Sequence, residues 1–445
     1  MQWTGPYHGN SMGLVHTPLL PFPLMSGDLP MDMTRREWLT VAGSLPFAGH
    51  GLASATQPDD RNAGQSKRFP DKAAFAPMGV TYLDSGAQHP LPLGAKAAGA
   101  AYLASRSLDV AAPKFELDSQ GALMRFARLV NADPDEVTFV QSTTTGEQMV
   151  LRALGIPESG GHIVSETLHF FGSLPLYEEM ARQGMQVSWV RPRDGRIELE
   201  DFRRAIVPGT KLVALSLVST INGFQHDLKA VCEIAHAAGA LVFADIIHAA
   251  GCVPIDLHDS GVDFASTASY KWLMGDFGLG FLYVRKDLQS KLNRAFYGYF
   301  GIGRFQSHVY PLDPPGETTA DYSFRDNATG VFALGTHAHA PIAMLNHSLE
   351  YIHALGVSNI QAHAQTLISR LKDELPKLGY TLLTPKESRT PLVACLMPNA
   401  TATLGPKLNA AKVKITTASN RFRISVSVFN DMTDIDRLLA ALGRA

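Results

Sequence analysis

Two polar side chains with complementary chemistry follow short apolar runs, and they set the expectations for the rest of the chain. Asp245 follows Leu241–Ala244, and Lys271 comes shortly after Phe264–Ala265. Short apolar runs rich in β-formers are typical of buried parallel strands, and ligands bind outside the carboxyl ends of such strands. A carboxylate and an amine at two strand ends can therefore face one bound molecule. Lys271 stands out because lysine is rarely buried without a partner, and apolar segments flank it.

The sequence around these residues resembles the core of class V aminotransferases, which are fold-type-I enzymes dependent on pyridoxal 5'-phosphate (PLP). The resemblance rests on four segments in the family's order: Asp245–His248, Val262–Phe264, Ser269–Trp272 and Gly278–Gly280. It implies that Lys271 carries the cofactor covalently and that Asp245 pairs with the protonated ring nitrogen. The residue types suit these roles, because a buried carboxylate keeps that nitrogen protonated and a displaced lysine can move protons at the α-carbon. Taken singly, Asp245 could be a helix cap and Lys271 a surface residue.

A run of hydroxyl residues follows the first well-defined strand, which we expect over 136–140. Thr143, Thr144 and Thr145 lie at the predicted start of a helix. Hydroxyl groups, free backbone N–H groups and the positive end of the helix dipole together make an anion site. Class V relatives bind the cofactor's phosphate here, although the run permits two registers for the contacting threonines. Ordinary helix capping uses the same residue types and stays open as an interpretation.

The resemblance alone assigns four further side chains to the cofactor: His169, His248, Ser269 and Tyr270. His169 takes the position of a ring that stacks on the cofactor's face and can pass protons, with Phe170 or Phe171 as rivals. His248 would hydrogen-bond the ring hydroxyl group, and Tyr270 would reach the phosphate. These assignments complete a predicted cofactor site.

An arginine near the C-terminus is the predicted substrate contact. The segment Arg421–Ser425 and the residues after it resemble the end of a class V chain, which implies that Arg423 binds the substrate's α-carboxylate. A planar guanidinium offers two parallel donors for such a group. Arg421 lies on the same strand face, so paired surface charges are the alternative. At Thr220 the chain departs from cysteine desulfurases, which carry asparagine there, next to the ring hydroxyl group.

The remaining pattern predicts how these residues are positioned. Strands and helices alternate from 136 to 284, which favours an α/β fold with a mainly parallel sheet covered on both faces. We expect a large PLP-binding domain over 78–330 and a small C-terminal α+β domain over 331–445. Residues 295–330 look irregular and are interpreted as an active-site or dimer-contact loop, with a mere surface connection as the alternative. Phe332–Thr336 resembles the family segment at the entry to the long helix of the small domain, and in relatives residues near it complete the other subunit's phosphate site, which implies a homodimer.

Composition excludes several classes of function. The chain has 445 residues, 45% hydrophobic content and a formal net charge of −2, and it has no long basic run, so nucleic acid is not an expected partner. No apolar stretch reaches the roughly 20 residues needed to span a bilayer, so stable membrane insertion is not expected. His337, His339 and His347 lack an acidic companion at ligand spacing, so we predict no metal site.

The first 55 residues differ from the rest and are interpreted as an extension plus a twin-arginine export signal, with a linker over 56–77. Thr34–Leu39 contains the arginine pair, a weakly apolar stretch follows to Leu52, and Ala53–Ala55 has the small residues of a cleavage site. Met31 or Met33 would then be the natural start. This predicts export to the periplasm by the twin-arginine translocase; a cytosolic N-terminal tail is the alternative.

The expected reaction is a transformation at the α-carbon of an amino acid or peptide-derived amine, with aminotransfer first. A PLP-dependent lyase of the kynureninase or C–S lyase type would share the same cofactor contacts, and a non-catalytic binding protein that retains the fold is a second alternative. Cysteine desulfurase activity is disfavoured, because 397–420 has no cysteine and Cys395 lies inside an apolar strand. Cys232 and Cys252 are expected to be buried.

Overall fold

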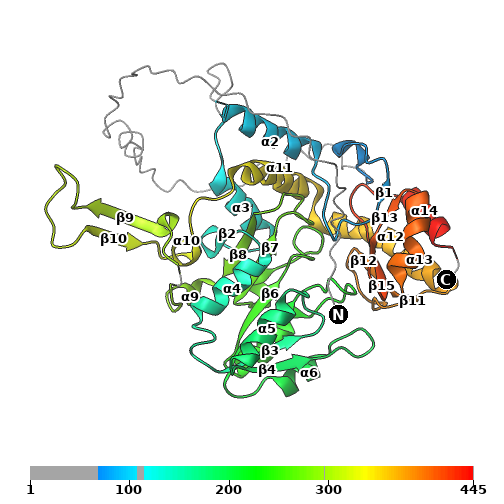
Figure 1. Cartoon of the computed structure of the whole chain (residues 1–445), viewed down its shortest axis with the longest axis horizontal. Helices are drawn as coiled ribbons and strands as arrows, with labels where there is room; N and C mark the ends of the chain where they lie inside the picture. Colours follow the sequence, from blue (N-terminus) through cyan, green and yellow to red (C-terminus); the bar gives the residue numbers. More distant parts are fainter. Residues whose placement is uncertain (1–68, 108–114, 295, 444–445) are drawn as a thin grey trace, which may run out of the picture. The chain divides into compact units, whose positions relative to one another are not determined.

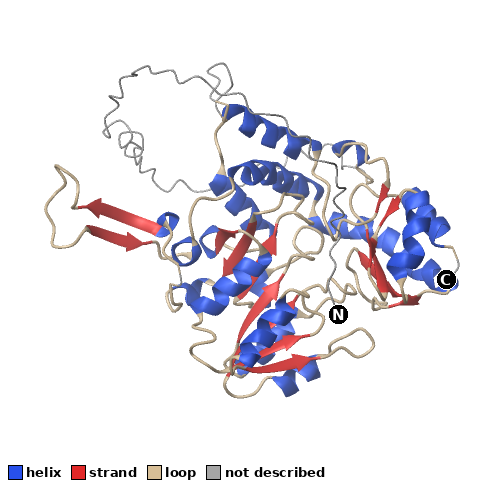
Figure 2. Cartoon of the chain, viewed as in Figure 1, coloured by secondary structure: helices blue, strands red, loops and turns tan. Residues whose placement is uncertain are grey.

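A seven-stranded sheet organises the computed structural model, which describes residues 69–107, 115–294 and 296–443 (Figures 1 and 2). The strand order is β2-β8-β7-β6-β5-β3-β4. Neighbours from β7 to β4 run parallel, whereas β8 is antiparallel to both β7 and β2. The strands are β2 (Val137–Val140), β3 (His162–Glu166), β4 (Gln186–Val190), β5 (Thr210–Ser216), β6 (Leu241–Asp245), β7 (Phe264–Ala268) and β8 (Gly280–Val284). The predicted α/β fold with a mostly parallel sheet is confirmed.

Alternating strand residues bury opposite faces of this sheet. Val242 and Ala244 join one hydrophobic cluster, while Phe243 between them joins another. Helices α3 (Ser119–Leu129), α6 (Leu199–Ala205), α7 (Leu228–Ala237), α8 (Leu257–Ser260) and α11 (His339–Leu355) supply the first cluster. Helices α4 (Thr143–Ala153), α5 (Ser173–Arg182), α9 (Lys286–Gln289) and α10 (Ala328–Phe332) supply the second. Burial on both faces explains why these strands are continuous apolar runs.

A second, four-stranded antiparallel sheet lies in the C-terminal part, in the order β11-β12-β15-β14. Its strands are β11 (Thr381–Leu382), β12 (Leu392–Leu396), β14 (Thr416–Thr417) and β15 (Arg421–Ser425). Helices α12 (Val357–Lys377), α13 (Ala400–Ala410) and α14 (Met432–Leu442) cover it and form a third cluster. The segment β1 (Thr81–Tyr82) pairs in parallel with β13 (Val413–Lys414), which brings the N-terminal side of the described chain to this part.

The boundary between the two parts stays a prediction. Helix α11 packs on α2 (Leu93–Ser105) and α3, and its apolar residues belong to the core of the seven-stranded sheet. The described residues all belong to one compact unit. Within them, no helix is long and apolar enough to cross a bilayer. Three short 3-10 helices, Lys72–Ala74, Pro134–Glu136 and Tyr299–Gly301, complete the elements.

The region 295–330 is not irregular, which corrects the sequence-based expectation. Strands β9 (Ile302–Ser307) and β10 (Ala320–Phe324) form an antiparallel hairpin that extends away from the central sheet (Figure 1). Both strands are mostly exposed, with Phe305 and Tyr322 each 60% accessible. β9 has no alternation of apolar and polar residues, whereas Ala320–Phe324 of β10 does alternate, so only one of the two strands carries the sequence pattern of a half-buried strand.

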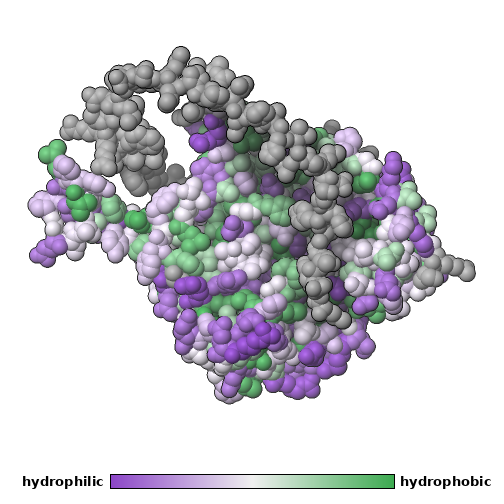
Figure 3. Space-filling view, viewed as in Figure 1, coloured by the Kyte–Doolittle hydropathy of each residue, from purple (hydrophilic) through white to green (hydrophobic). Residues whose placement is uncertain are grey.

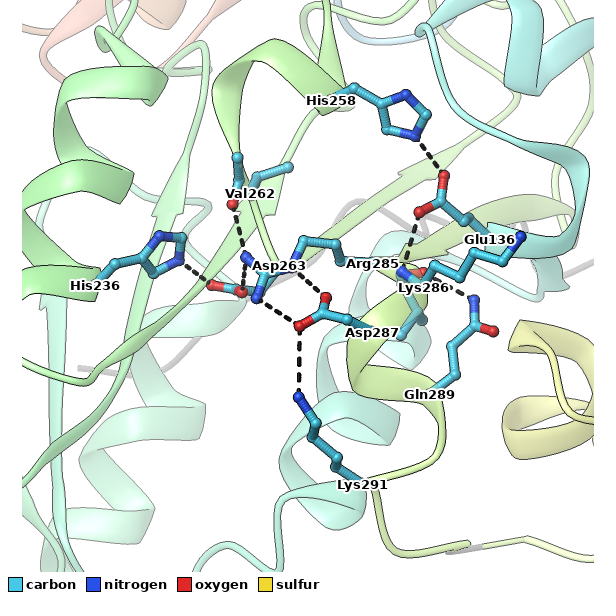
Figure 4. Close-up of polar contacts among 12 residues, drawn as sticks. Glu136, His236, His258, Val262, Asp263, Arg285, Lys286, Asp287, Gln289 and Lys291 are labelled. Atoms are coloured by element: carbon cyan, nitrogen blue, oxygen red, sulfur yellow. Dashed lines mark hydrogen bonds and ion pairs between the residues drawn. The ribbon is translucent and has the colours of Figure 1, made fainter.

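Buried carboxylates form ion pairs at the end of the sheet opposite the carboxyl ends of β6 and β7 (Figure 4). The Asp263 carboxylate contacts His236 Nε2 at 2.8 Å and Arg285 Nη1 at 2.7 Å, and accepts the Val242 N–H at 2.7 Å. Glu136 makes a similar contact, with His258 Nε2 at 2.6 Å from its carboxylate. These pairs hold the amino ends of β6 and β7 and the end of β8 together, which fixes the strands whose other ends carry the candidate site.

Candidate active site

The carboxyl ends of β6 and β7 bring the two predicted chemical groups to one edge of the sheet. Asp245 is the last residue of β6 and pairs in register with Ser266 of β7. After β7 the chain turns through Ser269, whose N–H bonds Leu279 O at 2.9 Å and whose hydroxyl donates to Asp276 O at 2.6 Å. These two hydrogen bonds of Ser269 close the loop between β7 and β8, and the closed loop positions Lys271 beside the strand ends.

Lys271 is 6% exposed, and its Nζ atom lies 2.9 Å from His248 Nε2. Burial lowers the pKa of Lys271 to about 8, with Asp245 opposing the shift and Arg423 adding to it. The pKa of His248 is lowered well below its ordinary value by burial, by Lys271 and by Arg423. The structure therefore brings together a lysine close to its neutral, nucleophilic form and a neutral imidazole.

The Asp245 carboxylate is buried and held by two donors. Oδ1 accepts the Ile247 N–H at 2.9 Å, and Oδ2 lies 3.3 Å from the Ser216 hydroxyl oxygen. Burial raises the pKa of Asp245, while His169, the Ile247 N–H and Lys271 oppose this shift. Asp245 is thus a fixed buried carboxylate that gains from a neighbouring cation, as the partner of a protonated ring nitrogen would require.

His169 is fully buried, and its ring nitrogens contact groups of the protein interior. Nδ1 lies 2.9 Å from Ser216 Oγ and 2.8 Å from the Phe170 amide nitrogen, and Nε2 lies 3.3 Å from Glu147 Oε1. Through Ser216, His169 is linked to the Asp245 carboxylate. Phe171 is 67% exposed and therefore faces solvent. Stacking of any of these rings on the cofactor stays a prediction.

Glu147 is a site-adjacent residue that the sequence analysis missed. It is 2% exposed and accepts hydrogen bonds from the Ser173 and Tyr177 hydroxyl groups, each at 2.7 Å. Burial alone would raise its pKa, but His169 and the two hydroxyl groups outweigh burial and lower it. Its spacing of four residues from Thr143 on α4 places both on the buried helix face, which was the available sequence signal.

The N-terminus of α4 carries the predicted anion site. Ser142 is the N-cap and accepts the Thr145 N–H at 3.1 Å, while its hydroxyl lies 2.9 Å from Thr145 Oγ1. The Thr143 hydroxyl is buried and has no hydrogen-bond partner among the described residues. Thr144 is half-buried in the first turn. Ser142 caps the helix, and the buried Thr143 hydroxyl is left without a partner, so binding of an anion at this helix N-terminus stays a prediction.

Arg423 of β15 reaches the same region from the C-terminal sheet. Its Nη1 donates to Thr220 Oγ1 at 2.6 Å and Thr220 O at 3.0 Å, and Nη2 donates to Thr416 Oγ1 at 3.1 Å. The Asp84 carboxylate lies 3.8 Å from Nη2. Arg423 is 7% exposed, and its Nε has no hydrogen-bond partner in the described part of the chain. Thr220, the position of departure from desulfurases, therefore orients this arginine.

Tyr270 and His89 border the lysine. The Tyr270 ring stacks on Phe277 with centroids 4.3 Å apart, and Lys271 Nζ lies 5.7 Å from its centroid. His89 is buried, with Nε2 2.7 Å from Ser427 Oγ, and burial lowers its pKa to about 4. His89 is thus a buried neutral imidazole, whereas the Tyr270 side chain is half-buried.

The cysteines lie outside this chemistry. Cys232, Cys252 and Cys395 are each 1% exposed or less, which confirms their predicted burial. Burial raises the pKa of Cys232 and of Cys395 to about 12, and raises that of Cys252 well above its ordinary value. None of them is a reactive thiolate at neutral pH.

A comparison with protein families assigns the chain to a family. Residues 81–438 match the family model described as aminotransferase class-V. The chain belongs to the class V aminotransferase family. Family members depend on PLP, and the fixed carboxylate of Asp245, the buried amine of Lys271 and the unsatisfied Thr143 hydroxyl at a helix N-terminus form a donor set that fits this cofactor.

Curated relatives in the family differ in activity. The chain is 29% identical over 306 residues to "Uncharacterized aminotransferase YcbU" of Bacillus subtilis, covering 68% of this chain and 78% of that protein. It is 28% identical over 342 residues to kynureninase of Pseudomonas fluorescens, covering 73% and 78%. A probable cysteine desulfurase of Methanothermobacter thermautotrophicus is 26% identical over 300 residues, covering 65% and 71%. The family assignment is therefore firm, while the reaction differs among these relatives.

Solved structures share the fold. The cysteine desulfurase CsdA of Escherichia coli has a TM-score of 0.71 at 20% identity and covers 83% of this chain and 96% of its own. The cystine C-S lyase C-DES has a TM-score of 0.70 at 20% identity, covering 82% and 98%. These similarities confirm the PLP-dependent fold-type-I architecture.

Proposed function

We propose that this class V PLP-dependent protein acts at the α-carbon of an amino acid or peptide-derived amine, with aminotransfer as its reaction. The observation that carries the proposal is the convergence of four buried groups: Lys271, Asp245, His248 and Arg423. Burying a lysine and an arginine close enough for the arginine to lower the pKa of the lysine is costly, and such cost is typical of functional sites. A binding protein without turnover would gain nothing from a lysine whose pKa is lowered to about 8.

Each residue has a role that its geometry supports. Bound PLP supplies an electron sink for negative charge at the α-carbon. The Asp245 carboxylate would hold the ring nitrogen, and the N-terminus of α4 with Thr143 would hold the phosphate. Lys271 would move the proton at the α-carbon, since an amine with a pKa near 8 can both accept and donate at neutral pH.

Arg423 would bind the substrate's carboxylate and set its orientation. Thr220 and Thr416 hold two of its nitrogens, and Nε remains to be satisfied. The position of Asp84 at 3.8 Å partly offsets the buried positive charge before substrate arrives. Preorganisation of this kind favours substrates that carry an α-carboxylate next to the amine.

A PLP-dependent lyase is the second candidate. The similarity to a kynureninase over 73% of this chain favours it, and every cofactor contact above would serve a lyase as well. Cysteine desulfuration is not proposed, because that chemistry needs a mobile nucleophilic thiol and the three cysteines are buried with raised pKa values.

The experiment that tests this proposal supplies PLP-loaded protein with a panel of amino acids, each with and without pyruvate or 2-oxoglutarate as amino acceptor. Mass spectrometry of the products separates the candidates. Amino-acid formation from the oxo acid supports aminotransfer, whereas ammonia or a cleaved side chain without an acceptor supports a lyase. Lys271→Ala is the control, and the absence of turnover with every substrate would contradict both candidates.

We also propose a homodimer in which the β9–β10 hairpin contacts the second copy. A two-stranded hairpin is marginal in water by itself, and Figure 3 shows hydrophobic surface at the end of this one. Its exposed apolar side chains, with those of its loop, are Phe305, Val309, Tyr310, Leu312 and Tyr322. Light scattering should give twice the monomer mass for the intact chain. A Phe305→Ser/Tyr322→Ser variant should dissociate, and a monomeric intact chain would contradict the proposal.

Export by the twin-arginine route is a further proposal. The residues of the predicted export signal lie outside the described part of the chain. Because this route moves folded proteins, PLP could be loaded before export. Fusing residues 1–77 to a reporter, with an Arg35→Lys/Arg36→Lys pair as control, tests the proposal. Periplasmic reporter that depends on the two arginines supports it, and reporter retained in the cytoplasm contradicts it.

A further inference from the structure

Trp272 contacts the histidine that contacts the lysine. The indole Nε1 lies 3.4 Å from His248 Nδ1, and His248 Nε2 lies 2.9 Å from Lys271 Nζ. Trp272 and His248 are each 2% exposed, so water does not compete for these contacts. The two ring nitrogens of His248 therefore face an indole on one side and an amine on the other.

The indole decides which nitrogen of His248 carries the hydrogen. An indole N–H is a donor only, so Nδ1 must accept and cannot bear a hydrogen. The ring is neutral, because burial and the neighbouring Arg423 guanidinium lower its pKa. A neutral imidazole that accepts at Nδ1 carries its single hydrogen on Nε2.

The Nε2–H group then points at the lysine. An ammonium group has no lone pair to accept a hydrogen bond, so the 2.9 Å contact is a hydrogen bond only if Lys271 is a neutral amine. The other groups that act on Lys271 are the Asp245 carboxylate, which favours the charged form, the Arg423 guanidinium, which disfavours it, and the face of the Tyr270 ring at 5.7 Å.

We propose that Trp272 is a positioning residue that fixes His248 as the Nε2–H tautomer and thereby stabilises the neutral, nucleophilic form of Lys271 relative to its ammonium form. This inference deepens the proposed function, since a neutral lysine is the form that attacks a carbonyl carbon and accepts a proton. Trp272 acts through His248 and needs no contact with cofactor or substrate.

The first test is the tautomer of His248 in the cofactor-free protein. Histidine-selective ¹⁵N labelling and NMR at pH 9, above the lysine pKa of about 8, with the resonance assigned by its loss in His248→Gln, should show a neutral ring with hydrogen on Nε2. A hydrogen on Nδ1, or a doubly protonated ring, would overturn the proposal without any change at Trp272. This measurement is independent of turnover, so it separates failure of this inference from failure of the proposed function.

The second test compares Trp272→Phe with the wild type, again without cofactor. Formaldehyde and cyanoborohydride methylate neutral amines, and peptide mass spectrometry reports the initial rate at Lys271 across pH 6–10. The variant should react about tenfold more slowly at pH 7, the effect of raising the lysine pKa by about one unit. Trp189→Phe, which removes a half-buried indole from β4, should leave the profile unchanged. An unchanged profile in a folded Trp272→Phe protein would refute the proposal.

Discussion

Replacing Lys271 by methionine is expected to stabilise the cofactor-free protein at neutral pH. Lys271 is 6% exposed, and burial lowers its pKa from 10.5 to about 8, with Asp245 opposing the shift and Arg423 adding to it. Below pH 8 the lysine is protonated in both the folded and the unfolded chain, so the folded state bears the full cost of a buried charge. Methionine has a similar length and no charge, and therefore removes that cost.

The size of the effect follows from the two pKa values. Lowering the pKa from 10.5 to about 8 costs about 3 kcal/mol, at about 1.4 kcal/mol for each tenfold change in the protonation equilibrium. Between pH 8 and 10.5 the folded protein has released the proton and the unfolded chain still binds it, so wild-type stability rises with pH. The charge-dependent advantage of the methionine variant should fall from about 3 kcal/mol at pH 7 to about 1 kcal/mol at pH 10.

Urea unfolding of the cofactor-free proteins at both pH values measures this difference. Lys291→Met is the matched control, because it removes the same charge from an exposed side chain. Its effect on the free energy of unfolding should be within about 0.5 kcal/mol of zero. If Lys271→Met gives the same change at pH 7 and pH 10, or destabilises only at pH 7, then the buried lysine is not held against a desolvation cost and the reasoning about its neutral form is wrong.

Three other outcomes are expected. Glu147→Gln should lower the free energy of unfolding at pH 7 by about 1–3 kcal/mol, because the buried contact with His169 loses its charge; an unchanged urea midpoint would speak against that contact. Arg423→Lys should raise KM for a carboxylate-bearing substrate about 10-fold to 100-fold with a smaller change in kcat, since one point charge replaces two parallel donors; equal losses in kcat alone would show a different role. Cys395→Ala should leave turnover within about twofold, as expected for a thiol outside the site, and abolished activity would reopen desulfuration.

The sheet and the two reactive groups at the ends of its strands could be predicted from the sequence, because the relevant patterns are local. Leu241–Ala244 and Phe264–Ala265 are short apolar runs, and polar residues follow each of them, so the pattern itself predicts that Asp245 and Lys271 lie at one end of the sheet. The burial of Lys271 likewise followed from its apolar flanks.

Other features depend on contacts between distant segments, which the sequence does not reveal. Thr220 and Arg423 are 203 residues apart, so their hydrogen bond could not be predicted from either segment. Glu147 is held by the hydroxyl groups of Ser173 and Tyr177, which lie 26 and 30 residues further along the chain, so its sequence neighbours do not reveal these contacts. The β9–β10 hairpin was missed because β9 lacks a period-two pattern and the five alternating residues of β10 are a short signal within a Gly- and Pro-rich stretch.

The measurement that tests the central claim most directly is the attachment of PLP to Lys271. Purified wild-type protein and Lys271→Ala are mixed with PLP, treated with borohydride, desalted and digested. The account predicts a visible absorbance band in the wild type before reduction, and a reduced cofactor on the Lys271 peptide after it, with both lost in the variant. A colourless wild-type protein that retains no PLP, or a cofactor attached at another lysine, would contradict the assignment of this site.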